Sequence, residues 1–397
     1  MSFHLHDYHF PFDHTRIAHH PCEPAHEAKM LICDLLPHLS FTDTHVSYLP
    51  TILSPQTILI ANNSQTIRGR IPLDHCIIQT PQGDKTPNQG SELLVVRLIR
   101  TKGLIDQHTL IVWASNKNIA KPGYRILFPD GTLLISKHFE DDGIWVHCEG
   151  AHIIDFLDRW GDIPLPPYID AKQVREKKHY LTSFGDQAGS VATPTAGLHF
   201  TPLLRQRLHE GGIGREEITL HVGIGTFAPI THPDIRQHTL HPEYCSIPRS
   251  LFGRLAQHYQ HNKPLVTIGT TSTRVIESLI YLYPLCRSHL LSFADTATIA
   301  WWDKKTQKLP THPAPTIQIF HHDTKGIHRS TNLFIYPGRH PTLITGIITN
   351  FHLPGTSLVM LVAGVMGYEQ RRQSYDYALT HKYRRASFGD CMYIRWS

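Results

Sequence analysis

The pattern of hydrophobic and polar residues changes character between residues 64 and 152. Short runs rich in β-branched residues alternate there with turn sequences that contain proline, glycine and aspartate. The runs are Glu92–Ile99, Thr109–Trp113, Tyr124–Phe128, Thr132–Ile135 and Ile144–Val146. Several short strands at regular turn spacing are typical of a small antiparallel barrel. We therefore predict an inserted β-barrel domain over residues 64–152.

The segments on either side of this insertion alternate between strand-like and helix-like patterns. Strands are predicted at Thr57–Ala61, Thr219–Val222, Leu265–Gly269, Leu333–Tyr336 and Leu343–Thr349, and helices at Thr201–Glu210, Arg249–Asn262, Ser272–Tyr283 and Ser357–Gly367. A further strand that leads into a polar turn is predicted at Trp301–Lys305. Alternating strands and helices indicate an α/β core. Residues 1–63 and 153–397 are therefore expected to form one α/β domain.

Composition narrows the class of protein. The chain has 397 residues, of which 41% are hydrophobic and 18% are charged, a globular balance that suggests about two domains. A formal net charge of +5 permits a polyanionic partner. Seven cysteines without a CxxC pair argue against a zinc ribbon and a disulfide framework, and favour reduced thiols in a cytosolic protein. The N-terminus does not resemble a signal peptide, and no window of 18 apolar residues predicts a membrane span.

Histidine is unusually frequent, with 31 residues. Most of them are scattered along the chain, which favours a surface composition effect over a metal site. The cluster His238-x-x-His241-x-Glu243 is the main exception. No third ligand follows it at zinc spacing, so an acid–base cluster is the better functional interpretation. A surface turn around Pro242 is the structural alternative.

Two glycine-containing segments combine small residues with groups that can act chemically. In Ser190–Thr201, Gly197 gives the backbone freedom beside His199, and Thr201 is a plausible helix N-cap. In Thr219–Ile230, His221 and Thr226 flank a GxG turn that follows a strand. A single GxG is weak evidence for phosphate or nucleotide binding, and an ordinary turn is the more frequent explanation.

Two further segments place hydroxyl and amide groups at strand ends. The run Thr270, Thr271, Ser272 and Thr273 is expected to precede a helix that carries Arg274 and Glu277. Hydroxyls and free amides at a helix N-terminus form a natural anion site, whereas N-capping would need only one of them. Asn350 and His352 follow a predicted strand before the Pro354-Gly355 turn. Ligands of α/β sheets bind at such carboxyl ends.

The order and the residue identities of these segments resemble those of a known family. PTAGLHFT, LHVGIGTF, the H-x-x-H-x-E cluster, GTTSTR-x-x-ES, TNFHLP and YR-x-x-SFGD-x-M follow one another along the chain. GDIPLPPYI and the N-terminal DYHFPFDHTRIAHHP add to the likeness, which covers nearly the whole sequence. Together they resemble the signature segments of the S-adenosylmethionine:tRNA ribosyltransferase-isomerase family.

The resemblance implies a fold, a reaction and its partners. The fold is a barrel-like α/β catalytic domain with a small inserted β-barrel. The reaction moves the ribosyl part of S-adenosylmethionine onto 7-aminomethyl-7-deazaguanine at the wobble position, in the anticodon loop of tRNA. The product is epoxyqueuosine in tRNA, with adenine and methionine released. S-adenosylmethionine is the co-substrate, and no metal is implied.

The chemistry of that reaction suggests roles for the residues. The sulfonium acidifies the neighbouring C5′ protons, so a positioned base can remove one. The candidate bases are His199, His221, His241, Glu243 and Glu277. His352 or Asn350 is expected to assist the departure of adenine. The methionyl carboxylate is expected near Arg274. The proposed co-substrate contacts are Gly197, Thr226, Thr270, Thr271, Ser272, Arg274 and Asn350.

The chain departs from the family pattern at several charged positions. Gly355 stands where the family usually has lysine, and Asn62-Asn63-Ser64-Gln65 replaces Asn-Asp-Thr-Arg. Residues Ala25–Lys29 occupy the place of an Arg-Asp pair, and extra residues occur around Leu285–Pro315. Two alternatives follow from these losses. One is a diverged relative that binds tRNA without catalysis, and the other is a transferase that uses S-adenosylmethionine on a different acceptor.

Overall fold

The computed structural model describes most of the chain. The described residues are 2–101, 104–116, 118–140, 143–170, 172–174, 176–227, 230–282, 315–322 and 326–396. The strand predicted at Trp301–Lys305 lies outside these residues, as do residues 285–314 of the additional segment.

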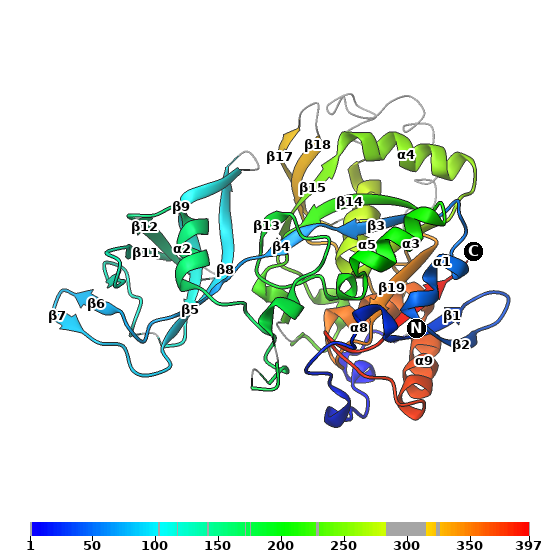
Figure 1. Ribbon diagram of the computed structural model, residues 1–397, viewed down its shortest axis with the longest axis horizontal. Coiled ribbons are helices and arrows are strands. Elements are labelled where there is room, and N and C mark those ends of the chain that lie inside the picture. Colours follow the sequence, from blue (N-terminus) through cyan, green and yellow to red (C-terminus); the bar gives the residue numbers. More distant parts are fainter. Residues whose placement is uncertain are drawn as a thin grey trace.

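A ten-stranded mixed sheet forms the centre of the larger part of the molecule (Figure 1). In spatial order its strands are β17 (Ile317–His322), β18 (Gly326–Thr331), β15 (Glu243–Pro248), β14 (Gly214–Leu220), β3 (Ile58–Asn62), β16 (Leu265–Ile268), β19 (Gly346–Asn350), β20 (Cys391–Arg395), β1 (Lys29–Asp34) and β2 (Ser40–His45). The four middle strands β14, β3, β16 and β19 are parallel. Every residue of β3 is buried, as expected for a parallel strand that is covered on both faces.

Helices pack around this sheet. They are α1 (Leu49–Ile52), α3 (Pro202–Glu210), α4 (Arg249–Gln260), α5 (Gly269–Ser278), α8 (Ser357–Met366) and α9 (Tyr368–Thr380). The α3 helix begins as predicted, because the Thr201 side chain accepts a hydrogen bond from the amide of Leu204. Thr356 caps α8 in the same way through the amide of Val359. The predicted α/β organisation of this part is confirmed.

The helix after β16 begins earlier than predicted. It was expected from Ser272, but α5 starts at Gly269, which has a φ of +84°. Glycine adopts this left-handed conformation without a steric penalty, so the chain turns directly from strand to helix. The hydroxyl run from Thr270 to Thr273 therefore lies inside a helix whose ten residues are all buried, and it is not a loop before the helix.

The prediction of a strand at Leu333–Tyr336 is wrong. The β18 strand ends at Thr331, and the following residues are irregular although Leu333, Phe334, Ile335 and Tyr336 are all buried. A run of apolar residues indicates that the segment is buried, but a buried segment does not have to pair with a neighbouring strand. The strand expected at Leu343–Thr349 forms only from Gly346, as β19.

A second sheet is built entirely from residues 70–149. It is antiparallel, and its strands in spatial order are β5 (Arg70–Pro72), β8 (Glu92–Thr101), β9 (Leu104–Ala114), β12 (Gly143–Glu149), β11 (Leu133–Glu140), β10 (Arg125–Leu127), β6 (Ile77–Thr80) and β7 (Gly83–Lys85). Each of the five predicted β runs overlaps one of these strands. Among the described residues no pairing joins β5 to β7, so closure into a barrel stays a prediction.

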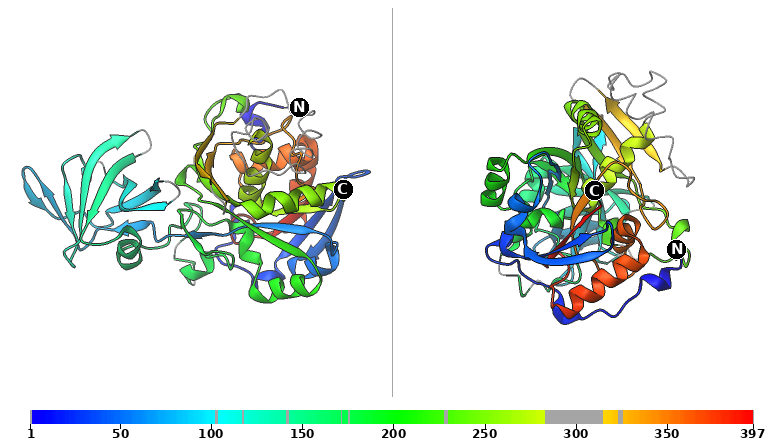
Figure 2. Two further views of the ribbon diagram at one scale, coloured as in Figure 1. Left: turned by 90° about the horizontal axis from the view of Figure 1, so that it is seen from above. Right: turned by 90° about the vertical axis from the view of Figure 1, so that its right-hand side faces the viewer.

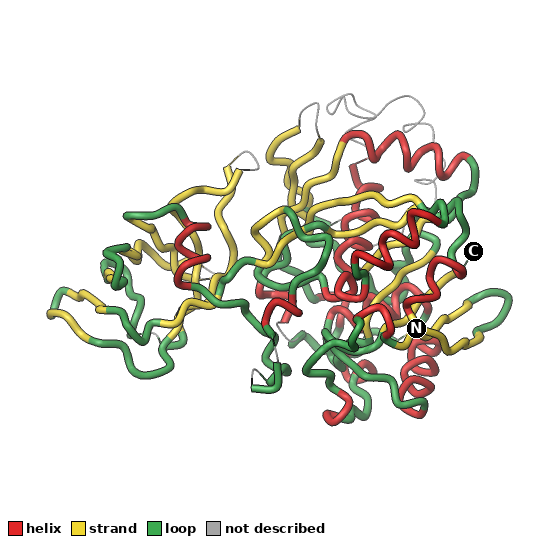
Figure 3. The backbone as a smooth tube through the Cα atoms, viewed as in Figure 1, coloured by secondary structure: helices red, strands yellow, loops and turns green. Residues whose placement is uncertain are grey.

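This second sheet has its own hydrophobic core and projects to one side of the larger part (Figure 2). Helix α2 (Ile153–Trp160) packs on it, with the ring of Phe156 edge-on to that of Phe128 at 4.9 Å. A short parallel pair, β4 (Ser64–Thr66) and β13 (Gln187–Ser190), lies where the two parts meet (Figures 1 and 3). None of the helices in the described residues is long and apolar enough to cross a membrane.

Candidate functional site

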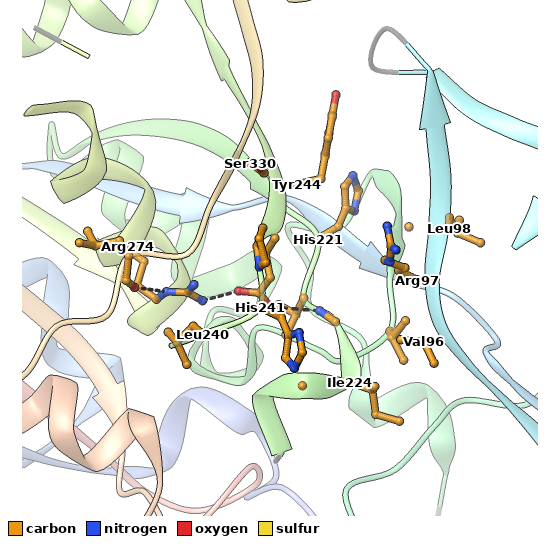
Figure 4. Close-up of a pocket in the computed structure, with 18 of the residues that line it drawn as sticks. Val96, Arg97, Leu98, His221, Ile224, Leu240, His241, Tyr244, Arg274 and Ser330 are labelled. Carbon is orange, nitrogen blue, oxygen red and sulfur yellow. Dashed lines mark hydrogen bonds and ion pairs between the residues drawn. The ribbon is translucent and has the colours of Figure 1, made fainter. Parts of the chain in front are cut away.

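Two cavities adjoin at the carboxyl ends of the parallel strands. The larger has a volume of about 580 Å³ and the smaller about 170 Å³. Val222 and Leu358 line both, so the two cavities share a wall. The larger cavity is also lined by β8 of the second sheet, which places it between the two parts of the molecule (Figure 4). This is the position at which α/β sheets bind ligands.

A buried ion pair forms part of the wall of the larger cavity (Figure 4). Nη1 of Arg274, from α5, pairs with Oε2 of Glu243, from β15, and their side chains are only 9% and 8% exposed. Nε of Arg274 donates to the carbonyl oxygen of Leu333 at 2.9 Å, and Oε1 of Glu243 accepts from the amide of Gly223 at 3.1 Å. Nη2 of Arg274 is buried without a hydrogen-bond partner among the described residues. A guanidinium with an unused donor beside a cavity suits a carboxylate ligand.

Arg100 from the second sheet reaches across to the first. Its Nη2 donates to the carbonyl oxygen of Ala188 at 3.1 Å and lies 2.7 Å from Nε2 of His221. A guanidinium can only donate, so Nε2 of His221 accepts and the proton of the neutral ring is on Nδ1. Burial and the charge of Arg100 hold the pKa of His221 well below its usual range. The basic nitrogen of His221 is therefore already engaged by Arg100.

A glycine makes this approach possible. Gly189 has a φ of +136°, and a Cβ atom built on it would lie 2.5 Å from Nη2 of Arg100 and 3.0 Å from Nδ1 of His221. Any larger residue would collide with the contact between the two side chains.

The histidine cluster divides on folding. His241 and Glu243 both line the larger cavity, whereas His238 lines neither cavity and packs edge-on against Phe334, with ring centroids 5.4 Å apart. Within the described ranges, no group of three or more histidine, cysteine, aspartate or glutamate residues is placed to hold a metal ion.

The smaller cavity brings together polar residues that follow two adjacent strands. Thr270 and Thr271 begin α5 after β16, and Asn350 and His352 lie at and after the end of β19. Oδ1 of Asn350 accepts from the hydroxyl of Thr195 at 3.4 Å. The remaining wall is largely apolar and includes the aromatic residues Tyr168, Tyr180 and Phe351. A small, largely apolar space with a few fixed polar groups suits a heteroaromatic ring.

Two buried histidines belong to this region. Nε2 of His199 lies 3.2 Å from Nδ2 of Asn350, so His199 supports the cavity wall without lining it. Nε2 of His352 lies 2.9 Å from the hydroxyl of Thr349. Burial lowers the pKa of His199 to about 4 and that of His352 to about 3. Both rings are therefore neutral at physiological pH.

Two residues that were predicted for the site lie outside both cavities. Glu277 was a candidate base, but its carboxylate accepts hydrogen bonds from the backbone amides of Thr342, Leu343 and Ile344 at 2.8 to 2.9 Å. It holds a loop in place and lines neither of the two cavities, because the helix turns it away from them. Ser272 is fully buried and also lines neither cavity.

The two remaining predicted contacts lie at glycine turns. Gly197 belongs to a 3₁₀ turn (Thr195–His199), where a built Cβ would lie 2.7 Å from the hydroxyl of Thr182. Its small size therefore serves a close packing contact. Thr226 lies in the turn Ile224–Phe227, but its side chain falls outside the described residues.

Sequence reasoning missed several residues that line the larger cavity. They are Arg97, Arg100, Trp113 and Trp145 from the second sheet and Tyr244 and Phe320 from the first. Tyr244 directly follows Glu243, so its place after the histidine cluster was a usable signal. The others lie on strands outside every motif, and only the folded chain brings them to the cavity.

The structure gives a role to one residue that matches the family pattern, Asn62, and to one that departs from it, Gly355. The side chain of Asn62 makes two hydrogen bonds to the backbone of Leu220. Nδ2 of Asn62 donates to the carbonyl oxygen of Leu220, and Oδ1 of Asn62 accepts from the amide of Leu220, both at 2.9 Å. It thereby joins the ends of β3 and β14. Gly355 has a φ of +69°, and a Cβ built on it would lie 3.0 Å from the ring of His9. Lysine at this position would be strained in the present backbone.

Comparison with known proteins identifies relatives over the full length. The family model described as queuosine biosynthesis protein matches residues 5–394. The chain is similar to the S-adenosylmethionine:tRNA ribosyltransferase-isomerase of Desulfitobacterium hafniense, with 29% identity over 98% of this chain and 99% of the relative. It is 30% identical to the protein of the same name from Treponema denticola, over 98% of this chain and 99% of the relative. A crystal structure of S-adenosylmethionine tRNA ribosyltransferase from Thermotoga maritima is 20% identical, with 98% and 99% coverage and a TM-score of 0.49.

Proposed function

The chain belongs to the queuosine biosynthesis protein family, and on this basis we propose that it is an S-adenosylmethionine:tRNA ribosyltransferase-isomerase. It transfers and isomerises the ribosyl moiety of S-adenosylmethionine onto 7-aminomethyl-7-deazaguanine at the wobble position of tRNA. The product is epoxyqueuosine in tRNA, and adenine and methionine leave. The observation that carries this proposal is the match over nearly the whole length of the chain, residues 5–394.

The paired cavities suggest how S-adenosylmethionine is bound. Its methionyl carboxylate pairs with Arg274, whose Nη2 has no other partner among the described residues. The adenine occupies the smaller cavity, where Asn350 and His352 provide polar contacts between apolar walls. The sulfonium and C5′ then lie near the wall that the two cavities share, at Val222 and Leu358.

Proton transfers can be assigned on this arrangement. His241 is the favoured base for removal of the C5′ proton, because it lines the larger cavity. Glu243 lines the same cavity, but its two carboxylate oxygens already bind Arg274 and the amide of Gly223. Glu277 is less suited, since three backbone amides already occupy its carboxylate. His352 is neutral, and the N–H of its ring can donate a hydrogen bond to the departing adenine. His199 keeps Asn350 in place.

The tRNA approaches through the larger cavity, which opens between the two parts of the molecule. Arg97 and Arg100 on β8 lie on this side and provide positive charge for a polyanion. The anticodon loop is the region of tRNA that must enter, because it carries the modified base. The free cysteines among the described residues fit a cytosolic enzyme.

Adenine release combined with nucleoside mass analysis tests the proposal. Purified protein is mixed with S-adenosylmethionine and tRNA that carries 7-aminomethyl-7-deazaguanine, and with unmodified tRNA as a control. We expect adenine and epoxyqueuosine only with the modified tRNA. His352→Ala should lower kcat by about 10²-fold or more, the usual effect of removing one positioned hydrogen-bond donor to developing charge. Adenine release without any new nucleoside, or no turnover at all, would reject the proposed function.

A further inference from the structure

Aromatic rings stack in a column beside the larger cavity. The rings of His221 and Tyr244 are 5.6 Å apart at 24°, and those of Tyr244 and Phe320 are 6.0 Å apart at 19°. The hydroxyl of Tyr244 lies 2.6 Å from Nδ1 of His328, and the guanidinium carbon of Arg100 lies 4.5 Å from the centre of the Tyr244 ring. The inner rings of the column are thus held by hydrogen bonds and by a stacked cation.

The outer end of the column is exposed. Phe320 lines the larger cavity and is 41% exposed, although a phenylalanine ring gains most from burial. It belongs to β17, which is the last strand of the ten-stranded sheet. An exposed aromatic ring on an edge strand has a cost for solubility unless a ligand covers it.

The backbone at Phe320 is irregular. Ile319 pairs with Arg329 and His321 pairs with His328, so Phe320 is the extra residue of a β-bulge. Bulges redirect a side chain, and they are frequent beside active sites. Here the bulge accompanies a ring that lies nearly parallel to that of Tyr244.

The facing wall has a matching composition. Trp113, which is 45% exposed, Trp145 and Arg97 line the same cavity from the second sheet. The ring of Trp145 stacks on His138 at 5.2 Å and 19°. Aromatic rings on both sides of an open cavity, together with the arginines of β8, are features with which proteins bind unpaired nucleotides.

We propose that Phe320 is a stacking platform for an unpaired base of the tRNA anticodon loop. The inference rests on the proposed function and adds a residue that positions the RNA. The base extends the column His221, Tyr244 and Phe320. Arg97, which pairs with Glu140 at 3.5 Å in the exposed part of the second sheet, turns to the backbone phosphates. An RNA base is the favoured occupant over the adenine of S-adenosylmethionine, because Phe320 is at the exposed rim whereas Arg274 and Glu243 are buried.

The test measures binding of a fluorescent anticodon stem-loop that carries 7-aminomethyl-7-deazaguanine. The variants are Phe320→Ala, which removes the ring, and Phe320→Tyr, which keeps it. Leu203→Ala, on α3, is the matched control because Leu203 is 45% exposed and lines neither cavity. We expect Phe320→Ala to raise the Kd for the RNA about 5- to 150-fold, the range for loss of one base–aromatic stack. Phe320→Tyr and Leu203→Ala should bind as the unchanged protein does, and the KM for S-adenosylmethionine should stay the same.

Several results would overturn the platform. The first is an unchanged Kd for the RNA in Phe320→Ala. The second is a rise in the KM for S-adenosylmethionine in Phe320→Ala without a change in RNA binding. The third is an equal loss of RNA binding in Phe320→Tyr, accompanied by a lowered melting temperature. An unchanged protein that does not bind the stem-loop also contradicts it. RNA binding that depends on the ring, in a protein that makes no epoxyqueuosine, would support the platform and contradict the proposed function, so the two failures are distinguishable.

Discussion

The guanidinium of Arg274 and the carboxylate of Glu243 form an ion pair in the wall of the larger cavity, with both side chains nearly buried. Removing one partner of such a pair leaves an uncompensated charge, which costs about 3–5 kcal/mol. Replacing both with apolar residues of similar volume is often neutral. The pair therefore allows its structural role to be separated from its role in binding.

We predict that Arg274→Met lowers the free energy of unfolding by about 3 kcal/mol, whereas Arg274→Met with Glu243→Leu regains most of that loss. Neither protein should bind S-adenosylmethionine at the concentration that saturates the unchanged enzyme, because both lack the cation for the methionyl carboxylate. Denaturant unfolding and calorimetric titration measure the two properties. A double variant that is stable and also binds the co-substrate normally would show that Arg274 is structural only.

Gly189 tests the contact between the two sheets. Gly189→Ala should displace Arg100 from His221, because the new Cβ would lie 2.5 Å from Nη2 of Arg100. Gly212→Ala is the matched control, since Gly212 also has a positive φ, +73°, but its Cβ would meet no atom closer than 3.7 Å. Both variants should lose about 1–2 kcal/mol of stability from backbone strain. Only Gly189→Ala should lower kcat/KM for tRNA, and equal activity in the two variants would argue against a role for the Arg100 bridge.

Buried histidines predict a pH dependence of stability. A histidine ionises near pH 6.5 in the unfolded chain, whereas burial lowers the pKa of His199 to about 4 and that of His352 to about 3. Between these values the unfolded state binds more protons, so stability is fully present above about pH 6.5 and falls as the pH drops toward 4. Each residue should contribute a loss of about 2 kcal/mol at pH 5.

Denaturant unfolding between pH 5 and 8 checks this prediction. His352→Gln should make the decline shallower, and His209→Gln, which replaces an exposed histidine on α3, should not change it. A decline that is equally steep in His352→Gln would mean that His352 does not lose its charge on folding.

Gly355 stands where the family usually has lysine, and the structure predicts that restoring lysine does not help. Its φ of +69° and the nearby ring of His9 make any side chain unfavourable in this backbone. Gly355→Lys and the matched Gly355→Ala should both lose about 1–2 kcal/mol of stability. The lysine variant should not exceed the alanine variant in kcat, measured by adenine release. A several-fold gain in kcat with lysine alone would show that a cation is missing at this position.

The sequence predicted correctly those features that depend on a few neighbouring residues. Asn350 ends a strand and His352 follows it, and Thr201 and Thr356 cap helices. These positions were predictable because strand ends and capping residues have local signatures. The predicted β runs of residues 92–146 form strands for the same reason, since turn residues mark their limits.

Long-range contacts explain what the sequence could not show. Glu277 was a reasonable base by residue type, but its partners are amides 65 to 67 positions away. Arg100 lies 121 positions from His221 and belongs to no motif. The irregular segment Leu333–Tyr336 was predicted as a strand because a buried irregular segment and a buried strand have the same run of apolar residues.

The most direct test of the account follows the ribosyl group itself. S-adenosylmethionine labelled with carbon-13 in every ribose carbon is incubated with the protein and tRNA that carries 7-aminomethyl-7-deazaguanine, and the nucleosides of the tRNA are analysed by mass. The account predicts one new nucleoside with the mass of epoxyqueuosine and the full ribose label, formed in the same amount as free adenine. Adenine that appears without label in the tRNA, or label on another acceptor, would contradict it.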